Sequence, residues 1–228
     1  MATTSQPDAA TPPLAAYADW SLADLLEHLG GIPAERIRLR PQPGTATEQD
    51  VIEAERHDHL CELIDGTLVE KAMGWRESRV AHLLGHLLED FLEEHDWGVV
   101  TGADGTVKLM PGQVRIPDVA FFSWDRFPNR RLPEEPIPNL APDLAIEVLS
   151  RGNTEGEMRR KLRDYFAAGV RLVWYIDPQS RNTRVHTAVD QTTVIGEDQP
   201  ISGGEVLPGF QVTLRDLLLR TDREPPAE

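Results

Sequence analysis

The sequence predicts a mixed α/β fold, in which helices cover a sheet of parallel and antiparallel strands. The first observation is a strand–helix–strand unit, with strands expected at residues 143–149 and 170–178 around a helix at 154–168. Because such a crossover joins parallel strands, its helix packs against the sheet. The second observation is a series of short β patterns, separated by turn sequences, before this unit. From Leu144 on, strand 143–149 is apolar on both faces except at Glu147, which is typical of a central strand covered on both sides.

The composition describes a chain of ordinary domain size that can form a hydrophobic core. The chain has 228 residues, of which 40% are hydrophobic, so we expect one main domain with extensions. Its single cysteine, Cys61, excludes an internal disulfide and a zinc ribbon. The sequence shows no signal-peptide pattern and no run of apolar residues that could span a bilayer. Together with the lone thiol, this predicts a cytoplasmic protein.

Charge is distributed unevenly along the chain. The formal net charge of −15 argues against binding nucleic acid through the overall field, because phosphate contacts rely on Lys and Arg. Residues 151–184 nevertheless contain eight basic and four acidic side chains. This basic segment is either a solvated helix face or a surface for phosphate groups.

The ends of the chain differ in composition from its main part. Residues 1–20 are small, polar and proline-containing, so we expect a disordered tail there and another at 221–228. Residues 21–56 are expected to form a helical extension, because capping residues precede two helical patterns. The main domain is expected at residues 57–220.

Within the main domain, helix and strand patterns alternate. Two short strands form a hairpin around Asp65-Gly66. Apolar residues at helical spacing predict a long helix at 76–96, and a final helix is expected at 213–220. Three strands are expected after the long helix, at 97–101, 106–110 and 113–122, and they are expected to follow one another as a meander. Later strands are expected at 181–189, 192–196 and, less regularly, 205–212.

Two carboxylates interrupt apolar strand patterns. Glu147 lies within "PDLAIEVLS", and Asp118 lies within "RIPDVAFF". A buried ionised carboxylate needs a cation or hydrogen-bond donors, because its transfer from water is otherwise costly. If the two strands are neighbours, both side chains can point into one notch, where Mg²⁺ could bind with one or two protein carboxylates and water. The alternative is a pair of structural acids bonded to arginine or to backbone amides.

Three stretches resemble the Uma-type family of putative restriction endonucleases, within the PD-(D/E)XK nuclease superfamily. They are "CELIDGTLVEKAMG", "VRIPDVAFFSWDR" and "PDLAIEVLSRGNTEGEMRRKLRDYFAAGVRLVWYIDP", and the resemblance covers about residues 57–220. It implies a restriction-endonuclease-like core, hydrolysis of DNA phosphodiester bonds and a Mg²⁺ or Mn²⁺ cofactor. We also expect a homodimer, because two sites can then address two strands.

The resemblance assigns roles to four acids. Asp118 matches the aspartate of the superfamily signature, and Glu147 matches its second acid. Both are expected to bind metal and take part in catalysis. Glu62 matches the glutamate of the family's "ELIDG" stretch and is expected to be catalytic. Glu77 resembles the helical acid that some nucleases of this fold add to the metal site.

The signature lysine is displaced in this sequence. Its usual position holds Leu149, so we expect Lys161, in the helix at 154–168, to act as the catalytic lysine. Lys161 borders the apolar stripe of that helix, so its methylenes can be buried while its ammonium extends toward the acids. We expect this ammonium within about 6 Å of a carboxylate oxygen of Glu147 or Asp118. Three arginines of the same helix are expected to face outward, toward DNA phosphates: Arg159, Arg160 and Arg163.

A second interpretation is a nuclease-fold domain that binds nucleic acid or protein with weak cleavage or none. The net charge and Leu149 favour it. In this interpretation Glu62 forms salt bridges within the hairpin, and Glu77 interacts with the N-terminal dipole of its helix. Lys161 is then an ordinary surface lysine.

Overall fold

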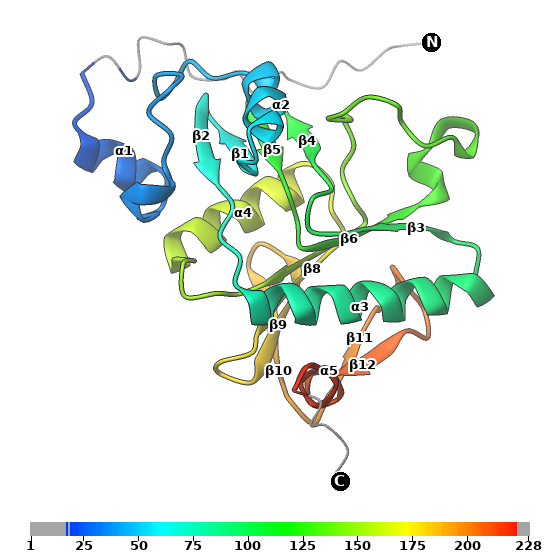
Figure 1. Cartoon of the computed structure of the whole chain (residues 1–228). Coiled ribbons are helices and arrows are strands. Elements are labelled where there is room, and N and C mark those ends of the chain that lie inside the picture. The colour runs from blue at the N-terminus through cyan, green and yellow to red at the C-terminus, as the bar shows by residue number, and fades with distance from the viewer. Residues whose placement is uncertain (1–16, 18, 223–228) are drawn as a thin grey trace, which may run out of the picture.

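Two β-sheets organise the described residues, which are 17 and 19–222 of this computed structural model. The larger sheet has the strand order β10-β9-β8-β7-β6-β3, and the smaller sheet has the order β2-β1-β5-β4 (Figure 1). A separate pair is formed by β11 and β12. The disordered tails expected at 1–20 and 221–228 lie almost entirely outside the described residues.

The strands are short and the helices differ widely in length. The larger sheet contains β3 (Gly98–Thr101), β6 (Val119–Ser123), β7 (Leu144–Val148), β8 (Leu172–Asp177), β9 (Asn182–Ala188) and β10 (Gln191–Gly196). The smaller sheet contains β1 (Cys61–Ile64), β2 (Thr67–Glu70), β4 (Val107–Met110) and β5 (Gln113–Arg115), and the separate pair is β11 (Pro200–Ser202) and β12 (Gln211–Thr213). The helices are α1 (Leu22–His28), α2 (Glu48–Arg56), α3 (Trp75–Glu94), α4 (Glu155–Ala167) and α5 (Leu214–Thr221), with 3₁₀ helices η2 (Ala34–Arg36), η3 (Trp124–Arg126) and η4 (Pro128–Arg130).

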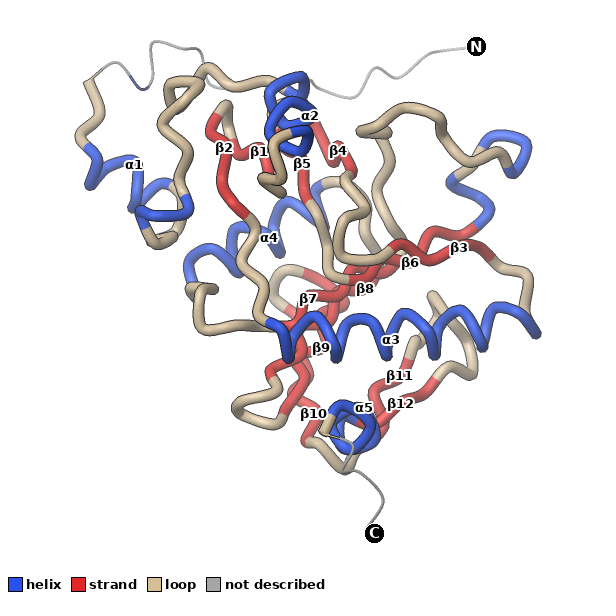
Figure 2. Tube along the Cα trace, viewed as in Figure 1, coloured by secondary structure: helices blue, strands red, loops and turns tan. Residues whose placement is uncertain are grey.

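Helices cover both faces of the larger sheet (Figure 2). The strands β7 and β8 run parallel, and α4 makes the crossover between them. Leu144, Ile146 and Val148 of β7 pack in one core with α3 and α5, whereas Ala145 packs in the opposite core with α4. The predicted mixed α/β fold, with a central strand covered on both sides, is therefore confirmed.

The prediction of a single strand at 113–122 is wrong, because this stretch contributes two strands to different sheets. β5 pairs with β1 and β4, whereas β6 pairs with β3 and β7. The chain crosses between the sheets at Pro117, which has no N–H to donate to a ladder. The expected three-strand meander is therefore also absent from the larger sheet. Asp118 stands at the entrance to β6, where its N–H donates to the Ile146 carbonyl oxygen at 3.0 Å.

The C-terminal strand expected at 205–212 is also shorter than predicted. Only β12 forms there, and it pairs with β11, which the sequence pattern did not indicate. Turns occupy most of the intervening segment, where Gly204 and Gly209 have φ values of +56° and +89°. Such values suit glycine and interrupt a strand. Among the described residues, no helix is long and apolar enough to cross a membrane.

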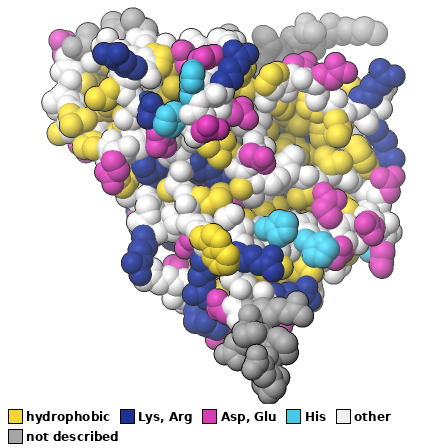
Figure 3. All heavy atoms as spheres, viewed as in Figure 1, with side chains coloured by type: hydrophobic (Ala, Val, Ile, Leu, Met, Phe, Trp, Pro, Cys, Tyr) yellow, Lys and Arg dark blue, Asp and Glu magenta, His cyan; other side chains and the backbone are white. Residues whose placement is uncertain are grey.

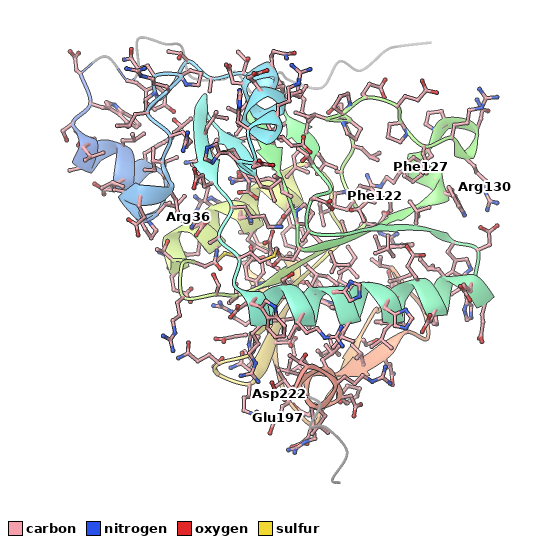
Figure 4. The ribbon with its side chains drawn as sticks, viewed as in Figure 1. Arg36, Phe122, Phe127, Arg130, Glu197 and Asp222 are labelled. Atoms are coloured by element: carbon pink, nitrogen blue, oxygen red, sulfur yellow. The ribbon has the colours of Figure 1, made fainter. Side chains whose placement is uncertain are left out.

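The N-terminal segment that contains α1 and η2 is clamped onto the start of α4. Arg36 donates to both carboxylate oxygens of Glu157 at 2.7 and 3.0 Å, and to the Gly152 carbonyl oxygen at 2.9 Å. Figure 4 shows Arg36 between the N-terminal segment and α4. The Thr154 hydroxyl donates to the Gly30 carbonyl oxygen at 2.7 Å. These contacts hold the N-terminal half of α4 in place.

Replacement of Gly30 tests this clamp. Gly30 has a φ of +86°, and a Cβ there would lie 2.4 Å from the carbonyl carbon of Gly156. We expect Gly30→Ala to lower the free energy of unfolding by about 3 kcal/mol, because it combines a backbone clash with left-handed strain. Gly31 is the control, since its φ is +75° but its Cβ would meet nothing within 4 Å. Gly31→Ala should cost only about 1 kcal/mol. Urea unfolding followed by circular dichroism measures both, and equal losses would contradict close packing of Gly30 on α4.

Candidate active site

The two acids singled out from the sequence lie side by side at the centre of the larger sheet. β6 and β7 are antiparallel, with Val119 opposite Ile146, so Asp118 lies beside Glu147. The Val148 N–H donates to Asp118 Oδ2 at 2.7 Å. Asp118 and Glu147 are only 3% and 4% exposed. The two strands are therefore neighbours, as the expected shared site requires, and both carboxylates are buried.

Lys161 reaches Glu147, one of these two acids, from α4. Its Nζ lies 3.0 Å from Glu147 Oε1 and 2.9 Å from Glu62 Oε1. The predicted approach of the ammonium to Glu147 is confirmed. Lys161 is 3% exposed, so it is not an ordinary surface lysine. It is held there because Met158 and Tyr165, on the same face of α4, are buried against the sheet.

Tyr165 is a second contact of Glu147, and the sequence analysis assigned it no role in the site. Its hydroxyl donates to Glu147 Oε1 at 2.5 Å. Burial raises the pKa of Glu147 to about 7, and the negative charges of Asp118 and Glu62 add to this effect. Lys161 opposes the shift but does not cancel it. Glu147 thus titrates close to neutral pH.

Glu62 is the acid of the group whose pKa is lowered, so its ionised form is favoured. Its Oε2 accepts from Arg115 at 2.9 Å, and its Oε1 accepts from the Ile116 N–H at 3.1 Å. Burial opposes ionisation, but Lys161 and Arg115 together hold the pKa of Glu62 at about 2. Arg115 also pairs with Asp164 of α4. Glu62 therefore forms salt bridges, as the alternative interpretation expects, but they reach beyond its hairpin to Lys161.

Arg115 and Lys71 are site residues that the sequence interpretation missed. Arg115 is a fully buried arginine within the apolar stretch "VRIPDV", which was an available signal. Lys71 follows β2, and its Nζ lies 2.8 Å from Asp118 Oδ1 and 2.9 Å from the Ala103 carbonyl oxygen. The chain has only three lysines, and two of them lie in this acid cluster. Residue counting could have drawn attention to Lys71, but its partner depends on the tertiary structure.

Glu77 lies at the edge of the site. It is in the first turn of α3 and lines an open hollow of about 450 Å³, together with Lys71, Ser150 and Arg151. Asp118 lines a neighbouring hollow of about 510 Å³ between α3 and the segment after β3. No group of three or more Asp, Glu, His or Cys placed to hold one metal ion occurs among the described residues. The role of Glu77 as a metal ligand stays a prediction.

The expected outward orientation of the α4 arginines is wrong for Arg160. Its guanidinium pairs with Asp65 and donates to the His28 carbonyl oxygen at 2.8 Å. The reason is that the N-terminal segment covers this side of α4. Arg159 and Arg163 are exposed as expected. Elsewhere, basic and acidic side chains are interspersed on the face shown in Figure 3, so this face carries charges of both signs.

The acids of the site fit a divalent cation in kind and number. Mg²⁺ prefers oxygen ligands and usually takes one or two carboxylates from a protein. Asp118 Oδ1 is buried and accepts no hydrogen bond with acceptable geometry, despite the nearby ammonium of Lys71. It is therefore an oxygen with spare capacity for a cation. In this structure the neighbouring positive charges come from Lys71 and Lys161.

Comparison with known proteins gives a family for the chain and a match to its fold. The family profile Uma2, described as "Putative restriction endonuclease", matches residues 48–215. The chain is also similar to the crystal structure of a putative nuclease belonging to DUF820 from Anabaena variabilis, with a TM-score of 0.64 and 19% identity. That match covers 72% of this chain and 92% of the other. None of the curated proteins compared matches the chain.

These matches identify the class and then the family. The shared architecture is the mixed α/β fold with a restriction-endonuclease-like core that was expected from the sequence. The chain belongs to the Uma2 family of putative restriction endonucleases.

The shifted pKa of Glu147 predicts how stability depends on pH. Its pKa is about 7 in the folded protein, compared with an ordinary value of 4.5. Between these values the folded state holds a proton that the unfolded state has released. The proton held by Glu147 therefore stabilises the folded state fully below pH 4.5, and this contribution is lost as the pH rises through about 7. The total change in the free energy of unfolding is up to about 3 kcal/mol.

Glu147→Gln provides the comparison, because it removes this titration and keeps the shape of the side chain. We expect the free energy of unfolding of the native protein to fall relative to that of the variant between pH 4.5 and 7. Urea unfolding in buffers with EDTA measures the difference. A difference that is constant with pH would contradict the raised pKa.

Proposed function

We propose that the protein is a metal-dependent endonuclease that hydrolyses DNA phosphodiester bonds. The observation that supports this most strongly is the convergence of Asp118, Glu147 and Lys161 from three different elements. The family membership supports a nuclease, and the metal and the substrate are our inference. Signature acids with a lysine from the following helix provide the groups that such hydrolysis needs.

Each residue has a distinct task in this proposal. Asp118 and Glu147 hold the divalent metal, Mg²⁺ or Mn²⁺, with Glu77 as a further candidate ligand. When bound, such a metal activates water and neutralises charge on phosphoryl oxygens. Lys161 stabilises the charge that develops on the phosphate. Glu62 is a positioning residue, because its ionised carboxylate holds the Lys161 ammonium beside Glu147.

The tyrosine and the exposed arginines complete the proposed site. Tyr165 orients Glu147 through its hydrogen bond. Arg159 and Arg163 on α4, and Arg151 before it, are exposed and available to DNA phosphates. Two copies of the chain would allow both strands of a duplex to be cut, so we propose that the protein acts as a homodimer.

The second candidate is a nuclease-fold domain that binds nucleic acid or protein without cleavage. The ion pair between Lys71 and Asp118 favours it, because a lysine already neutralises the signature acid. Calorimetric titration with Mn²⁺, with and without DNA, separates the two candidates. Absence of metal binding in both titrations would support the non-cleaving domain.

Loss of the signature acids should abolish cleavage. In a plasmid-nicking assay with Mg²⁺ or Mn²⁺, we expect Asp118→Asn and Glu147→Gln to lower the rate by at least about 100-fold, because the metal loses a carboxylate ligand. Both variants keep the size of the side chain. Lys108→Met is the matched control, since Lys108 pairs with Glu48 outside the site. Equal rates in all four proteins would contradict the proposed function.

Loss of the lysine should separate catalysis from metal binding. We expect Lys161→Ala to lower the cleavage rate by about 100-fold, while changing Mn²⁺ affinity much less, because the ammonium stabilises developing charge. Plasmid nicking measures the first quantity and calorimetry the second. A variant that loses metal affinity and rate in equal measure would show that Lys161 serves only to organise the acids.

A further inference from the structure

The ammonium of Lys71 lies against the acid that the proposed function assigns to metal binding. We propose that Lys71 is an internal counter-ion, which occupies the cation position at Asp118 and which a divalent metal must displace. The inference rests on the proposed function only in taking Asp118 as a metal ligand. It identifies Lys71 as the residue that controls whether the site accepts metal.

The two oxygens of Asp118 have different kinds of partner. Oδ2 accepts a directed hydrogen bond of 2.7 Å from the Val148 N–H, which fixes the carboxylate against β7. Oδ1 is buried and accepts no hydrogen bond with acceptable geometry. Its close neighbour is Lys71 Nζ at 2.8 Å. Lys71 therefore stabilises Oδ1 mainly through charge, which is the contribution that another cation can replace.

Lys71 and a metal ion cannot both contact Oδ1 without strong repulsion. A Mg²⁺ ion bound to this oxygen would lie about 2.1 Å from it, and Lys71 Nζ lies 2.8 Å from it. The two cations would then be at most about 5 Å apart in a buried site, where like charges interact strongly. Metal binding at Asp118 therefore requires the ammonium to move away.

The structure also provides a place for the displaced ammonium. Among the described residues, Lys71 Nζ contacts one backbone oxygen besides Asp118, that of Ala103 at 2.9 Å. Lys71 also lines the open hollow of about 450 Å³ that contains Glu77. A flexible four-carbon stem allows the ammonium to turn into this hollow. Glu77 lines the same hollow, and in this inference it receives Lys71 and does not bind the metal.

Lys161, unlike Lys71, is not expected to move when a metal binds. It is held between Glu147 and Glu62, at 3.0 and 2.9 Å, and α4 packs it against the sheet. A metal that took one oxygen of Glu147 would leave Lys161 paired with Glu62. We therefore expect Lys161 to remain in place while Lys71 moves.

Titration calorimetry with Mn²⁺ alone tests the competition. We expect Lys71→Met to bind Mn²⁺ at least about tenfold more tightly than the native chain, because the variant keeps the apolar stem and loses the competing charge. Lys108→Met, which removes a lysine paired with Glu48, should leave the affinity unchanged. Equal or weaker binding by Lys71→Met, or no binding by any of the three proteins, would overturn the proposal.

A measurement on the native chain keeps the test decisive if Lys71→Met folds poorly. The three lysines can be acetylated with acetic anhydride and followed by mass spectrometry, with and without Mn²⁺. We expect Mn²⁺ to increase the acetylation of Lys71, with Lys161 still protected and Lys108 reactive in both conditions. If Lys71 stays protected at the highest Mn²⁺ concentration, the proposal is wrong.

Plasmid nicking, run in parallel, separates this inference from the proposed function. Tighter Mn²⁺ binding by Lys71→Met, with no cleavage by the native chain or by the variant, would support the counter-ion and overturn the endonuclease. Cleavage by the native chain, without tighter Mn²⁺ binding by Lys71→Met, would support the endonuclease and overturn the counter-ion.

Discussion

The structure depends on one buried ammonium, that of Lys161, which joins three parts of the fold. Glu62 belongs to β1 of the smaller sheet, Glu147 belongs to β7 of the larger sheet, and Lys161 belongs to α4. Burial favours the neutral amine, but Glu147 and then Glu62 raise the pKa of Lys161 above its ordinary value. The ammonium therefore remains charged, and both sheets must keep their positions relative to α4.

This interaction explains why other charges accompany it. Removal of one partner from a buried ion pair leaves an uncompensated charge, which costs about 3–5 kcal/mol. Arg115 satisfies the second oxygen of Glu62 and reaches Asp164 on α4, so the same elements are joined a second time. Lys71 then balances Asp118. The cluster is thus a set of charges in which each member is stable only because its neighbours are present.

The remote parts of the fold support the same cluster. The N-terminal segment holds the start of α4 through Arg36 and Thr154, and its Gly30 packs directly on Gly156. On the other face, α3 and α5 pack against β7. Since β7 carries Glu147 and α4 carries Lys161, this packing sets the distance between the two groups. The Uma2 fold thereby positions its charged residues from both sides of the central strand.

The local sequence determined the elements whose signals are short in range. The helix at α4 follows from a capping residue, Asn153 or Thr154, and from apolar residues at helical spacing, and the structure shows that the cap is Thr154. The strand β7 follows from a nearly continuous apolar run. The same two elements made the contact between Lys161 and Glu147 predictable, because a short loop brings the helix over the end of the strand. The acids were recognisable since a carboxylate in an apolar strand needs a partner.

Only the tertiary structure decided which partners those acids have. The break at Pro117 was not predicted, although a proline within a strand pattern is an available signal, because sheet membership depends on neighbouring strands. Lys71 and Tyr165 belong to the site because a hairpin and a helix place their polar ends against Asp118 and Glu147. Residue spacing specifies which face of an element a side chain occupies. It does not specify which distant charge lies opposite, since that depends on how the two sheets and α4 pack together.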